Sequence, residues 1–348
     1  MNQTLGSEEK ILKVLRKFDG LDSTGELLWR VSSQDGSVAI QYGNQDKPFF
    51  VASATKLFVT AILAQLKNEG LIDWDRPIYQ YLPNLDLSNL STNGSDDFGQ
   101  LITIREVMAH TSGLPDYFEG KQAKTQTTIE RAIRSDFAWN LSDVLEWSRK
   151  MKPVKRGNGL YSDTGYQLLG ALIEQIDGVS FSESVRKRVA GPLGLSSTYV
   201  FDKSTINNYP EIAQMLNGRS KLNIPLAMSS VQADGGIVST VDEASRFLEA
   251  FFSGALFPKE LLQEIATSWH PIFPPLEYGT GIMRFKLPAF MTGFRKVPEF
   301  IGHSGASGTV MFFSPKLGMS VVGTVNQIQK RSLPFSLMIR CALLGSLE

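Results

Sequence analysis

Apolar and polar residues follow two different periods along the chain, and the period changes toward both ends. The segments Glu26–Ser32 and Ser37–Gly43 alternate with a period of two around Gln34-Asp35-Gly36, which predicts a β-hairpin. Near the other end, four segments joined by short Gly- or Pro-containing turns predict further strands: Gly281–Lys286, Glu299–His303, Val310–Ser314 and Ser320–Val325. Strand patterns therefore lie at both ends of the chain.

Helical patterns fill much of the region between these strands. The almost wholly apolar run Leu57–Leu66 predicts a buried helix from about Ser53 to Asn68, ending at Gly70. Other segments bounded by Gly or Pro predict shorter helices at Ile104–His110, Leu141–Lys150, Thr164–Ile176, Phe181–Val189, Asp242–Phe252 and Pro334–Leu344.

Strands at both ends with helices between them predict an α+β fold, an α/β sandwich. One antiparallel sheet is expected to form from both chain ends, flanked by helices. Residues 1–70 and 220–348 would form this sheet domain, and residues 71–219 an inserted, mainly helical domain, with the active site between the two. A length of 348 residues accommodates about two domains.

Composition and charge narrow the range of partners. The 35 basic and 35 acidic residues cancel, so the sequence predicts no nucleic-acid partner. The run Leu57–Leu66 is about half a membrane span, so no membrane span is expected. The N-terminal segment lacks the apolar core of a secretory signal, which predicts a cytoplasmic protein, or a periplasmic or secreted one if a leader was removed. An oligomeric state cannot be read from these features.

Cysteine and histidine usage argues against disulfide, metal and cofactor chemistry. The sole cysteine, Cys341, lies in an apolar run and is predicted to be a buried, inert thiol. The histidines His110, His270 and His303 are far apart and lack the spacing of a metal site. The sequence therefore predicts neither a metal nor a cofactor.

The first candidate motif is Ser53-Ala54-Thr55-Lys56, which opens the apolar helix. The positive end of a helix stabilises negative charge that develops there, and positions i and i+3 share one face, so the Lys56 amine can reach the Ser53 hydroxyl. Burial would lower the pKa of Lys56 and let it accept a proton. The alternative is a serine N-cap followed by a solvated lysine, which an apolar helix disfavours.

The second motif is Tyr161-Ser162-Asp163, which follows Gly157-Asn158-Gly159 and precedes a helix. A tyrosine beside a cationic lysine is expected to have a lowered pKa, which makes Tyr161 a candidate general base. Tyr161 could instead be a packing aromatic residue, and Asp163 could be the N-cap of the following helix.

The third motif, His303-Ser304-Gly305, falls at the end of a predicted strand and continues into Ala306-Ser307-Gly308. Glycines let a substrate backbone approach a strand edge closely, so His303, Ser304 and Gly305 are candidate substrate-binding residues. A tight β-turn is the alternative. His110, in His110-Thr111-Ser112-Gly113, lies among helix-end and turn signals, where a histidine usually binds backbone groups rather than acting as a base.

Together and in this order, Ser53-x-x-Lys56, Tyr161-x-Asp163 and His303-x-Gly305 resemble the three motifs of the serine β-lactamase-like and penicillin-binding-protein family. That family includes class C β-lactamases, D-Ala-D-Ala carboxypeptidases and related esterases. The resemblance covers roughly residues 25–345. It implies an acyl-enzyme on Ser53, an oxyanion hole formed by the backbone N–H groups of Ser53 and Ala306, and proton transfers shared by Lys56 and Tyr161.

Two positions depart from the commonest family pattern. Asp163 stands where many members have Asn, so it could bind Lys56 or disfavour anionic substrates, because a carboxylate only accepts hydrogen bonds. His303 stands where many β-lactamases have Lys, and a neutral histidine binds a substrate carboxylate less firmly.

The sequence therefore predicts a serine hydrolase that acts through an acyl-enzyme on a small ester, amide or D-amino-acid peptide. Its partner would be a small molecule or short peptide. Two alternatives stay open: a penicillin-binding or receptor-like protein that acylates without efficient turnover, and a true β-lactamase.

Overall fold

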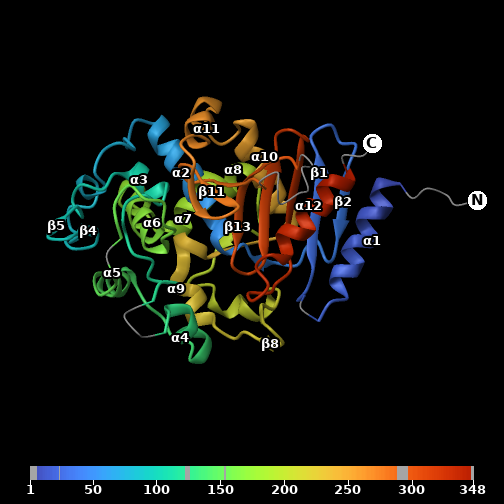
Figure 1. Cartoon of the computed structure of the whole chain (residues 1–348), viewed down its shortest axis with the longest axis horizontal. Helices are drawn as coiled ribbons and strands as arrows, with labels where there is room; N and C mark the ends of the chain where they lie inside the picture. The colour runs from blue at the N-terminus through green and yellow to red at the C-terminus, as the bar shows by residue number, and fades with distance from the viewer. Residues whose placement is uncertain (1–5, 23, 122–125, 153, 288–296, 346–348) are drawn as a thin grey trace, which may run out of the picture.

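An eight-stranded antiparallel sheet dominates the computed structural model, which describes residues 6–22, 24–121, 126–152, 154–287 and 297–345 (Figure 1). Within those residues the strand order is β10-β11-β12-β13-β14-β15-β1-β2. The strands are β1 (Leu28–Ser33), β2 (Ala39–Tyr42), β10 (His270–Phe273), β11 (Leu276–Tyr278), β12 (Met283–Phe285), β13 (Phe300–Gly305), β14 (Thr309–Ser314) and β15 (Met319–Thr324).

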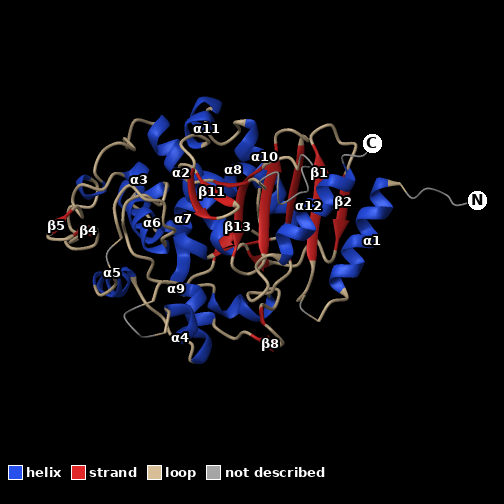
Figure 2. Ribbon diagram, in the orientation of Figure 1, coloured by secondary structure: helices blue, strands red, loops and turns tan. Residues whose placement is uncertain are grey.

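The two ends of the chain meet inside this sheet. Strand β1 lies between β2 and β15, with Leu28 opposite Thr324 and Ser33 opposite Met319. Figure 2 shows these strands side by side on the half of the molecule that also carries both described termini. The expected sheet built from both chain ends is confirmed.

Helices cover both faces of the sheet. Helices α1 (Ser7–Asp19) and α12 (Leu333–Gly345) pack on one face and α10 (Val241–Ser253) on the other. On β15, Val321 contacts the cluster beneath α12 whereas its neighbour Val322 joins the cluster on the opposite face, as strand geometry requires. Two covered faces explain why these strands read as continuous apolar runs.

Cys341 lies within the cluster between α12 and the sheet, fully buried. Burial raises the pKa of its thiol to about 12, so the thiol stays protonated and unreactive at neutral pH. The expectation of a buried, inert cysteine is confirmed.

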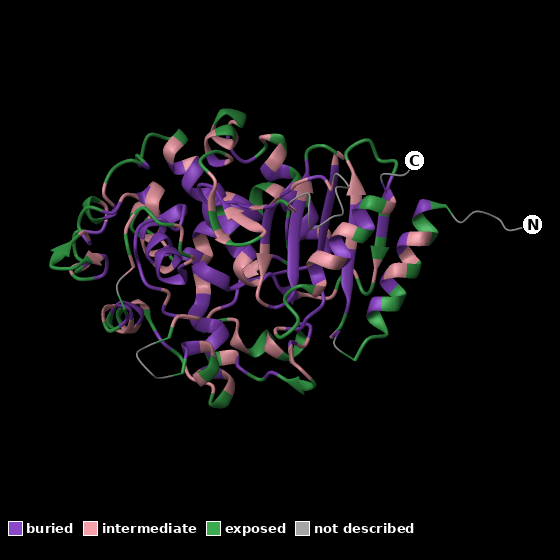
Figure 3. Cartoon of the chain, viewed as in Figure 1, coloured by how far each residue is buried: buried purple, intermediate pink, exposed green. Residues whose placement is uncertain are grey.

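Helix α2 (Thr55–Asn68) runs through the centre of the molecule, and its residues from Thr55 to Ala64 are all buried (Figure 3). It packs against α6 (Asp163–Asp177) and α9 (Pro225–Gly235), which explains an apolar sequence without a polar face. The chain leaves the helix through Gly70, whose φ of 73° is readily adopted by glycine.

The remaining elements surround this central helix. Helices α3, α4 and α5 each begin with a capping box, in which the N-cap and the third helical residue exchange hydrogen bonds. These helices and the others are α3 (Ile104–Met108), α4 (Thr128–Arg134), α5 (Leu141–Arg149), α7 (Phe181–Val185), α8 (Gly191–Leu193) and α11 (Lys259–Ile265). The short strands are β3 (Phe49–Phe50), β4 (Thr92–Asn93), β5 (Asp96–Asp97), β6 (Tyr199–Val200), β7 (Leu216–Asn217), β8 (Ser220–Lys221) and β9 (Ile237–Ser239).

A second, three-stranded sheet in the order β3-β9-β6 connects the parts of the chain that the sequence assigned to different domains. Strand β6 lies within the expected insertion and pairs with β9 of the expected sheet domain. The proposed boundaries at residues 70 and 220 stay a prediction. No helix in the described ranges has the length and apolar character needed to cross a membrane.

Candidate active site

Ser53 lies in a 3-10 turn, Ala52–Ala54, that connects the short strand β3 to helix α2. The strand is fixed against β9, and Val51 donates its N–H to the carbonyl of Ile237 at 2.9 Å. Ala52 has a φ of 49°, a conformation that costs a non-glycine residue about 1 kcal/mol or more. This strained turn leaves Ser53 partly exposed at the start of an otherwise buried helix.

The end of strand β13 approaches this turn very closely. A Cβ atom on Gly305 would lie 2.5 Å from the Val51 carbonyl oxygen and 2.9 Å from the Ala52 Cβ, so only glycine fits there. Just beyond, the Ser307 hydroxyl donates to the Phe50 carbonyl at 3.1 Å. These contacts bring Ala306 and Ser53 to the same cavity.

Lys56 is completely buried one turn below Ser53. Its Nζ donates to Asp163 Oδ1 at 2.7 Å and to the Asp234 carbonyl at 2.6 Å. The same atom lies 5.0 Å from the ring centroids of both Tyr161 and Tyr166, in the range of a cation–π contact. The structure thus forms the Lys56–Asp163 contact that the sequence left open.

Three neighbouring carboxyl groups form what we call the carboxylate cluster: Asp163 and Asp234 are buried, and the half-buried Asp116 accepts the Asp163 N–H at 3.2 Å. Burial raises the pKa of Asp116 to about 8, helped by the nearby charge of Asp163, although backbone N–H groups lower it. Burial also raises the pKa of Asp163 and Asp234, against the lowering effect of Lys56. Because the pKa of Asp116 is raised to about 8, this carboxyl group keeps its proton near neutral pH.

Tyr161 lies on the loop before α6, above Lys56. Burial and the charge of Asp163 raise the pKa of its phenol well above 10, and only the Ser53 hydroxyl counters them significantly. The expectation of a lowered pKa is therefore wrong, because burial, and after it the charge of Asp163, dominates the titration of the phenol. The Tyr161 oxygen is buried without a fully formed hydrogen bond among the described residues, and Ser53 is close enough to influence its titration.

His303 is buried on strand β13, and both of its ring nitrogens make hydrogen bonds. Nδ1 donates to the Ser304 carbonyl at 2.7 Å, so Nε2 is the acceptor for the Tyr278 hydroxyl at 2.9 Å. The Tyr278 hydroxyl also lies 3.2 Å from that of Tyr166. Burial lowers the pKa of His303 to about 3, so the ring is neutral at physiological pH.

His110 packs against Tyr161 and Tyr278, the same two rings that His303 contacts. Its Nδ1 accepts the Ser162 N–H at 3.1 Å, and its ring lies 4.3 Å from that of Tyr161, centroid to centroid. Burial lowers its pKa well below 6.5. As expected from the turn signals, His110 binds a backbone group. We call these rings the aromatic cluster: His110, Tyr161, Tyr166, Tyr278 and His303.

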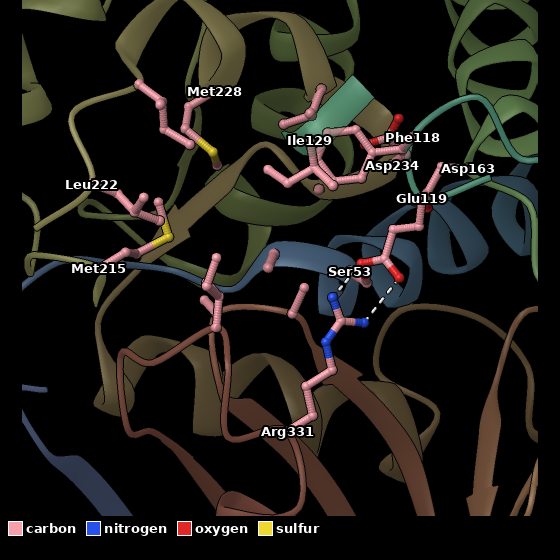
Figure 4. A pocket seen from close by; sticks show the side chains of 17 residues that line it. Ser53, Phe118, Glu119, Ile129, Asp163, Met215, Leu222, Met228, Asp234 and Arg331 are labelled. Carbon is pink, nitrogen blue, oxygen red and sulfur yellow. Dashed lines mark hydrogen bonds and ion pairs between the residues drawn. The ribbon is translucent and has the colours of Figure 1, made fainter. Parts of the chain in front are cut away.

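A cavity of about 70 Å³ opens at Ser53 (Figure 4). Its polar and charged lining consists of Ser53, Glu119, Asp163, Asp234, Ser307 and Arg331, and most of the other lining side chains are apolar. Near Ser53, Arg331 Nη1 donates to Glu119 Oε2 at 2.9 Å, which joins a segment of the helical region to the chain just before α12.

The structure brings together all three sequence motifs. Ser304 is the exception in orientation, because its hydroxyl points to the Met283 sulfur at 3.5 Å. Asp163 is not the helix N-cap; Ser162 holds that position, and Asp163 is the first helical residue.

Several neighbours were missed. Asp116 follows Pro115 in a turn, and Glu119 and Arg331 are 212 residues apart, so no local pattern could reveal their pairing. Asp234 lies in α9, a helix that the sequence pattern did not predict. Among residues 6–22, 24–121, 126–152, 154–287 and 297–345, no group of three or more His, Cys, Asp or Glu is arranged to hold a metal ion.

An antiparallel sheet flanked by helices, with Ser53, Lys56 and Tyr161 close together at the start of α2, is typical of proteins of the serine β-lactamase and penicillin-binding-protein type. The Beta-lactamase family model matches residues 32–333, so the chain belongs to the Beta-lactamase family. The family expected from the three motifs is confirmed, and with it the class of enzyme, a hydrolase.

Two curated relatives and one solved structure illustrate this membership. Penicillin-binding protein PbpX of Bacillus subtilis is 23% identical over 80% of this chain and 64% of its own length. The teichoic acid D-alanine hydrolase of Staphylococcus aureus is 26% identical over 78% of this chain and 68% of its own length. The matched region thus spans about two thirds of these relatives.

The D-amino acid amidase of Ochrobactrum anthropi SV3 has the same fold, with a TM-score of 0.80 and 22% identity over 97% of this chain and 98% of the amidase. The expected fold class is confirmed by this similarity.

Proposed function

We propose that the protein is a serine hydrolase that transfers the acyl group of a small ester, amide or D-amino-acid peptide to Ser53 and then to water. The observation that carries this proposal is the buried Tyr161 hydroxyl, which lacks a fully formed hydrogen bond and is close enough to Ser53 to respond to it. Named hydrolases of D-amino acid derivatives among the similar proteins support the D-amino-acid class.

The raised pKa of Tyr161 favours a relay rather than a resident phenolate base. In acylation, the Ser53 oxygen forms a bond to the carbonyl carbon and the Ser53 proton passes to Tyr161. The bond from the carbonyl carbon to the leaving oxygen or nitrogen breaks, and the Tyr161 proton passes to that leaving atom, which departs as an alcohol or amine. The phenol ends as it began, so the step is balanced. Lys56, 5.0 Å from the Tyr161 ring, stabilises negative charge that develops on the phenol oxygen.

Deacylation uses the same groups with water in place of the leaving group. Water gives a proton to Tyr161, its oxygen attacks the acyl carbon, and Tyr161 returns a proton to Ser53. The backbone N–H groups of Ser53 and Ala306 would bind the carbonyl oxygen in both steps. Under this proposal His303 does not bind the substrate directly, since both ring nitrogens are already hydrogen-bonded within the protein. Its role is to hold the Tyr278 hydroxyl and the end of strand β13 in position.

The test combines covalent labelling with turnover. The wild type and Ser53→Ala are incubated with a fluorophosphonate, the adduct is located by mass spectrometry, and hydrolysis of nitrophenyl acetate and butyrate is followed. Ser184→Ala is the matched control, because Ser184 begins another S-x-x-K sequence on α7. Labelling at Ser53 with turnover, abolished only in Ser53→Ala, is the expected result.

Other outcomes separate the alternatives. An adduct on Ser53 without turnover would identify a receptor-like protein. Nitrocefin hydrolysis with a kcat/KM above roughly 10⁵ M⁻¹s⁻¹, inside the ordinary enzyme range, would identify a β-lactamase. Full esterase activity in Ser53→Ala would overturn the mechanism.

A further inference from the structure

The cavity at Ser53 has an apolar wall that the proposed chemistry does not use. Figure 4 shows Met215, Leu222 and Met228 together on one side of the cavity, away from the Glu119–Arg331 pair near Ser53. Other apolar side chains complete this wall from separate parts of the fold: Phe118, Ile129, Ile224, Val231 and Ile328.

The position of Tyr161 determines which part of a substrate this wall contacts. Tyr161 is outside the lining of the cavity and instead lies beside Phe273, with ring centroids 6.0 Å apart. A proton relayed by Tyr161 reaches the leaving group, so the leaving group lies on the Tyr161 side of Ser53. The cavity, which Tyr161 does not line, then receives the acyl group.

The chemistry of the wall favours an uncharged acyl group. Met215 and Met228 are only 5% and 7% exposed, so the wall is closed behind the cavity, and their flexible thioethers adapt to different apolar shapes. Glu119 and Arg331 neutralise each other at 2.9 Å. A charged acyl tail would lose its hydration against the methionines without gaining an unpaired partner.

The volume sets the size of the group. A cavity of about 70 Å³ holds about two to three groups of the size of a water molecule, which occupies about 30 Å³ in the liquid, and a methylene group is of similar size. We infer that the methionine-lined cavity is the acyl site for a short apolar group of about two to three carbons beyond the carbonyl, either a fatty acyl chain or the side chain of a D-amino acid. This inference rests on the proposed function, because it requires an acyl-enzyme on Ser53.

The experiment measures kcat/KM for nitrophenyl esters with acyl chains of two, four, six, eight and ten carbons. Burial of each methylene should raise kcat/KM about fourfold up to four carbons, and longer chains should give no further gain. The hemisuccinate ester should be at least tenfold poorer than the butyrate ester of the same chain length. D-Leucine amide compared with D-alanine amide tests the amino-acid source of the same apolar group.

Two variants locate the preference in the cavity. Met228→Trp fills it and should lower the ratio of kcat/KM for hexanoate over acetate at least tenfold, whereas Met215→Ala enlarges it and should move the optimum to longer chains. Met338→Ala is the matched control, because it removes a buried methionine from the cluster between α12 and the sheet. It should leave the chain-length profile unchanged.

The outcomes distinguish this inference from the proposed function. Absence of labelling and of hydrolysis for every ester would reject the proposed function itself. Turnover with acetate as the best substrate, or a chain-length profile that neither cavity variant changes, would reject the acyl site and leave the hydrolase intact. A gain with chain length for esters but not for D-amino acid amides would assign the site to fatty acyl groups.

Discussion

The two clusters beside Ser53 compensate in different ways for the free-energy cost of burying polar and charged groups. The carboxylate cluster pairs Asp163 with the ammonium group of Lys56, and burial raises the pKa of the neighbouring Asp116 and Asp234 carboxyl groups. The aromatic cluster keeps its two histidines neutral and connects hydroxyls and ring nitrogens in a chain of hydrogen bonds. One cluster holds charge and exchanges protons near neutral pH, whereas the other is neutral throughout that range.

This difference gives the two clusters opposite contributions to stability as the pH changes. A raised carboxyl pKa means that the folded state binds more protons than the unfolded state, so stability decreases as the pH rises toward that pKa. A lowered histidine pKa means that the folded state binds fewer protons, so stability decreases as the pH falls below about 6.5. The site should be most stable in mildly acidic solution.

The largest expected effect comes from breaking the contact between the clusters. Lys56→Ala should lower kcat by about 10³-fold or more, because the lost ammonium group no longer stabilises charge on Tyr161. The substitution also leaves the buried Asp163 carboxyl group without its partner. Tyr161→Phe should have a loss of similar size.

The double variant Lys56→Ala/Tyr161→Phe measures whether the two residues form one proton-handling unit. Its kcat should be little lower than that of the more damaged single variant, since residues that act together are strongly non-additive. If the two losses simply multiply, the two residues act independently and the relay is incorrect.

The next largest effect concerns how the carboxylate cluster makes the free energy of unfolding depend on pH. Because the pKa of Asp116 is raised to about 8, the free energy of unfolding should fall between pH 4 and 8 by on the order of 1 kcal/mol per pH unit from this group. Asp116→Asn should flatten that slope. Urea unfolding at several pH values measures the slope of the unfolding free energy against pH. Equal slopes in the wild type and in Asp116→Asn would show that a group other than Asp116 retains the proton.

The sequence was most informative where local pattern and burial coincide. The apolar run after Ser53 is apolar because α2 is surrounded on all sides, and the strands β13 to β15 are covered on both faces. Helix α9 and the strands β10 and β11 were missed. Helix α9 is buried along most of its length and has no polar face, so it lacks the periodicity that reveals an amphipathic helix.

The motifs identified which residues meet but not how they share charge. Tyr161 was expected to have a lowered pKa beside Lys56, and its pKa is instead raised, first by burial and then by the charge of Asp163 on the following helix. The methionine wall and the Glu119–Arg331 pair come from segments distant in the sequence. Such contacts depend on tertiary packing, for which a single sequence has no local signal.

A smaller effect tests the aromatic cluster. The pKa of His303 is lowered to about 3, so this residue should reduce stability by up to about 1 kcal/mol per pH unit as the pH falls from about 6.5 toward 4. His303→Gln should make the acid side of the stability curve shallower. His270→Gln is the control, since it makes the same change at a half-exposed histidine on β10. An equal slope in His303→Gln and the wild type would contradict a buried neutral ring.

The smallest effect concerns the charge that Asp163 presents to the cavity. Asp163 lines the cavity and pairs with Lys56 at 2.7 Å, so Asp163→Asn changes the pair from neutral to positive. At an effective dielectric of about 20, a unit charge about 4 Å away contributes about 4 kcal/mol, which solvent and neighbouring groups should reduce to roughly 1 kcal/mol. The ratio of kcat/KM for hemisuccinate over butyrate should therefore rise several-fold in the variant.

The pH dependence of that ratio distinguishes charge from shape. Since burial raises the pKa of Asp163, the wild-type carboxyl group carries more charge as the pH rises, and the wild-type ratio should fall accordingly. The ratio in Asp163→Asn lacks this titration, so the two proteins should differ more at pH 8.5 than at pH 5.5. A several-fold difference that is the same at both pH values would mean that the amide alters the fit of the acyl group. No difference at either pH would mean that Lys56 already cancels the charge of Asp163 toward the substrate.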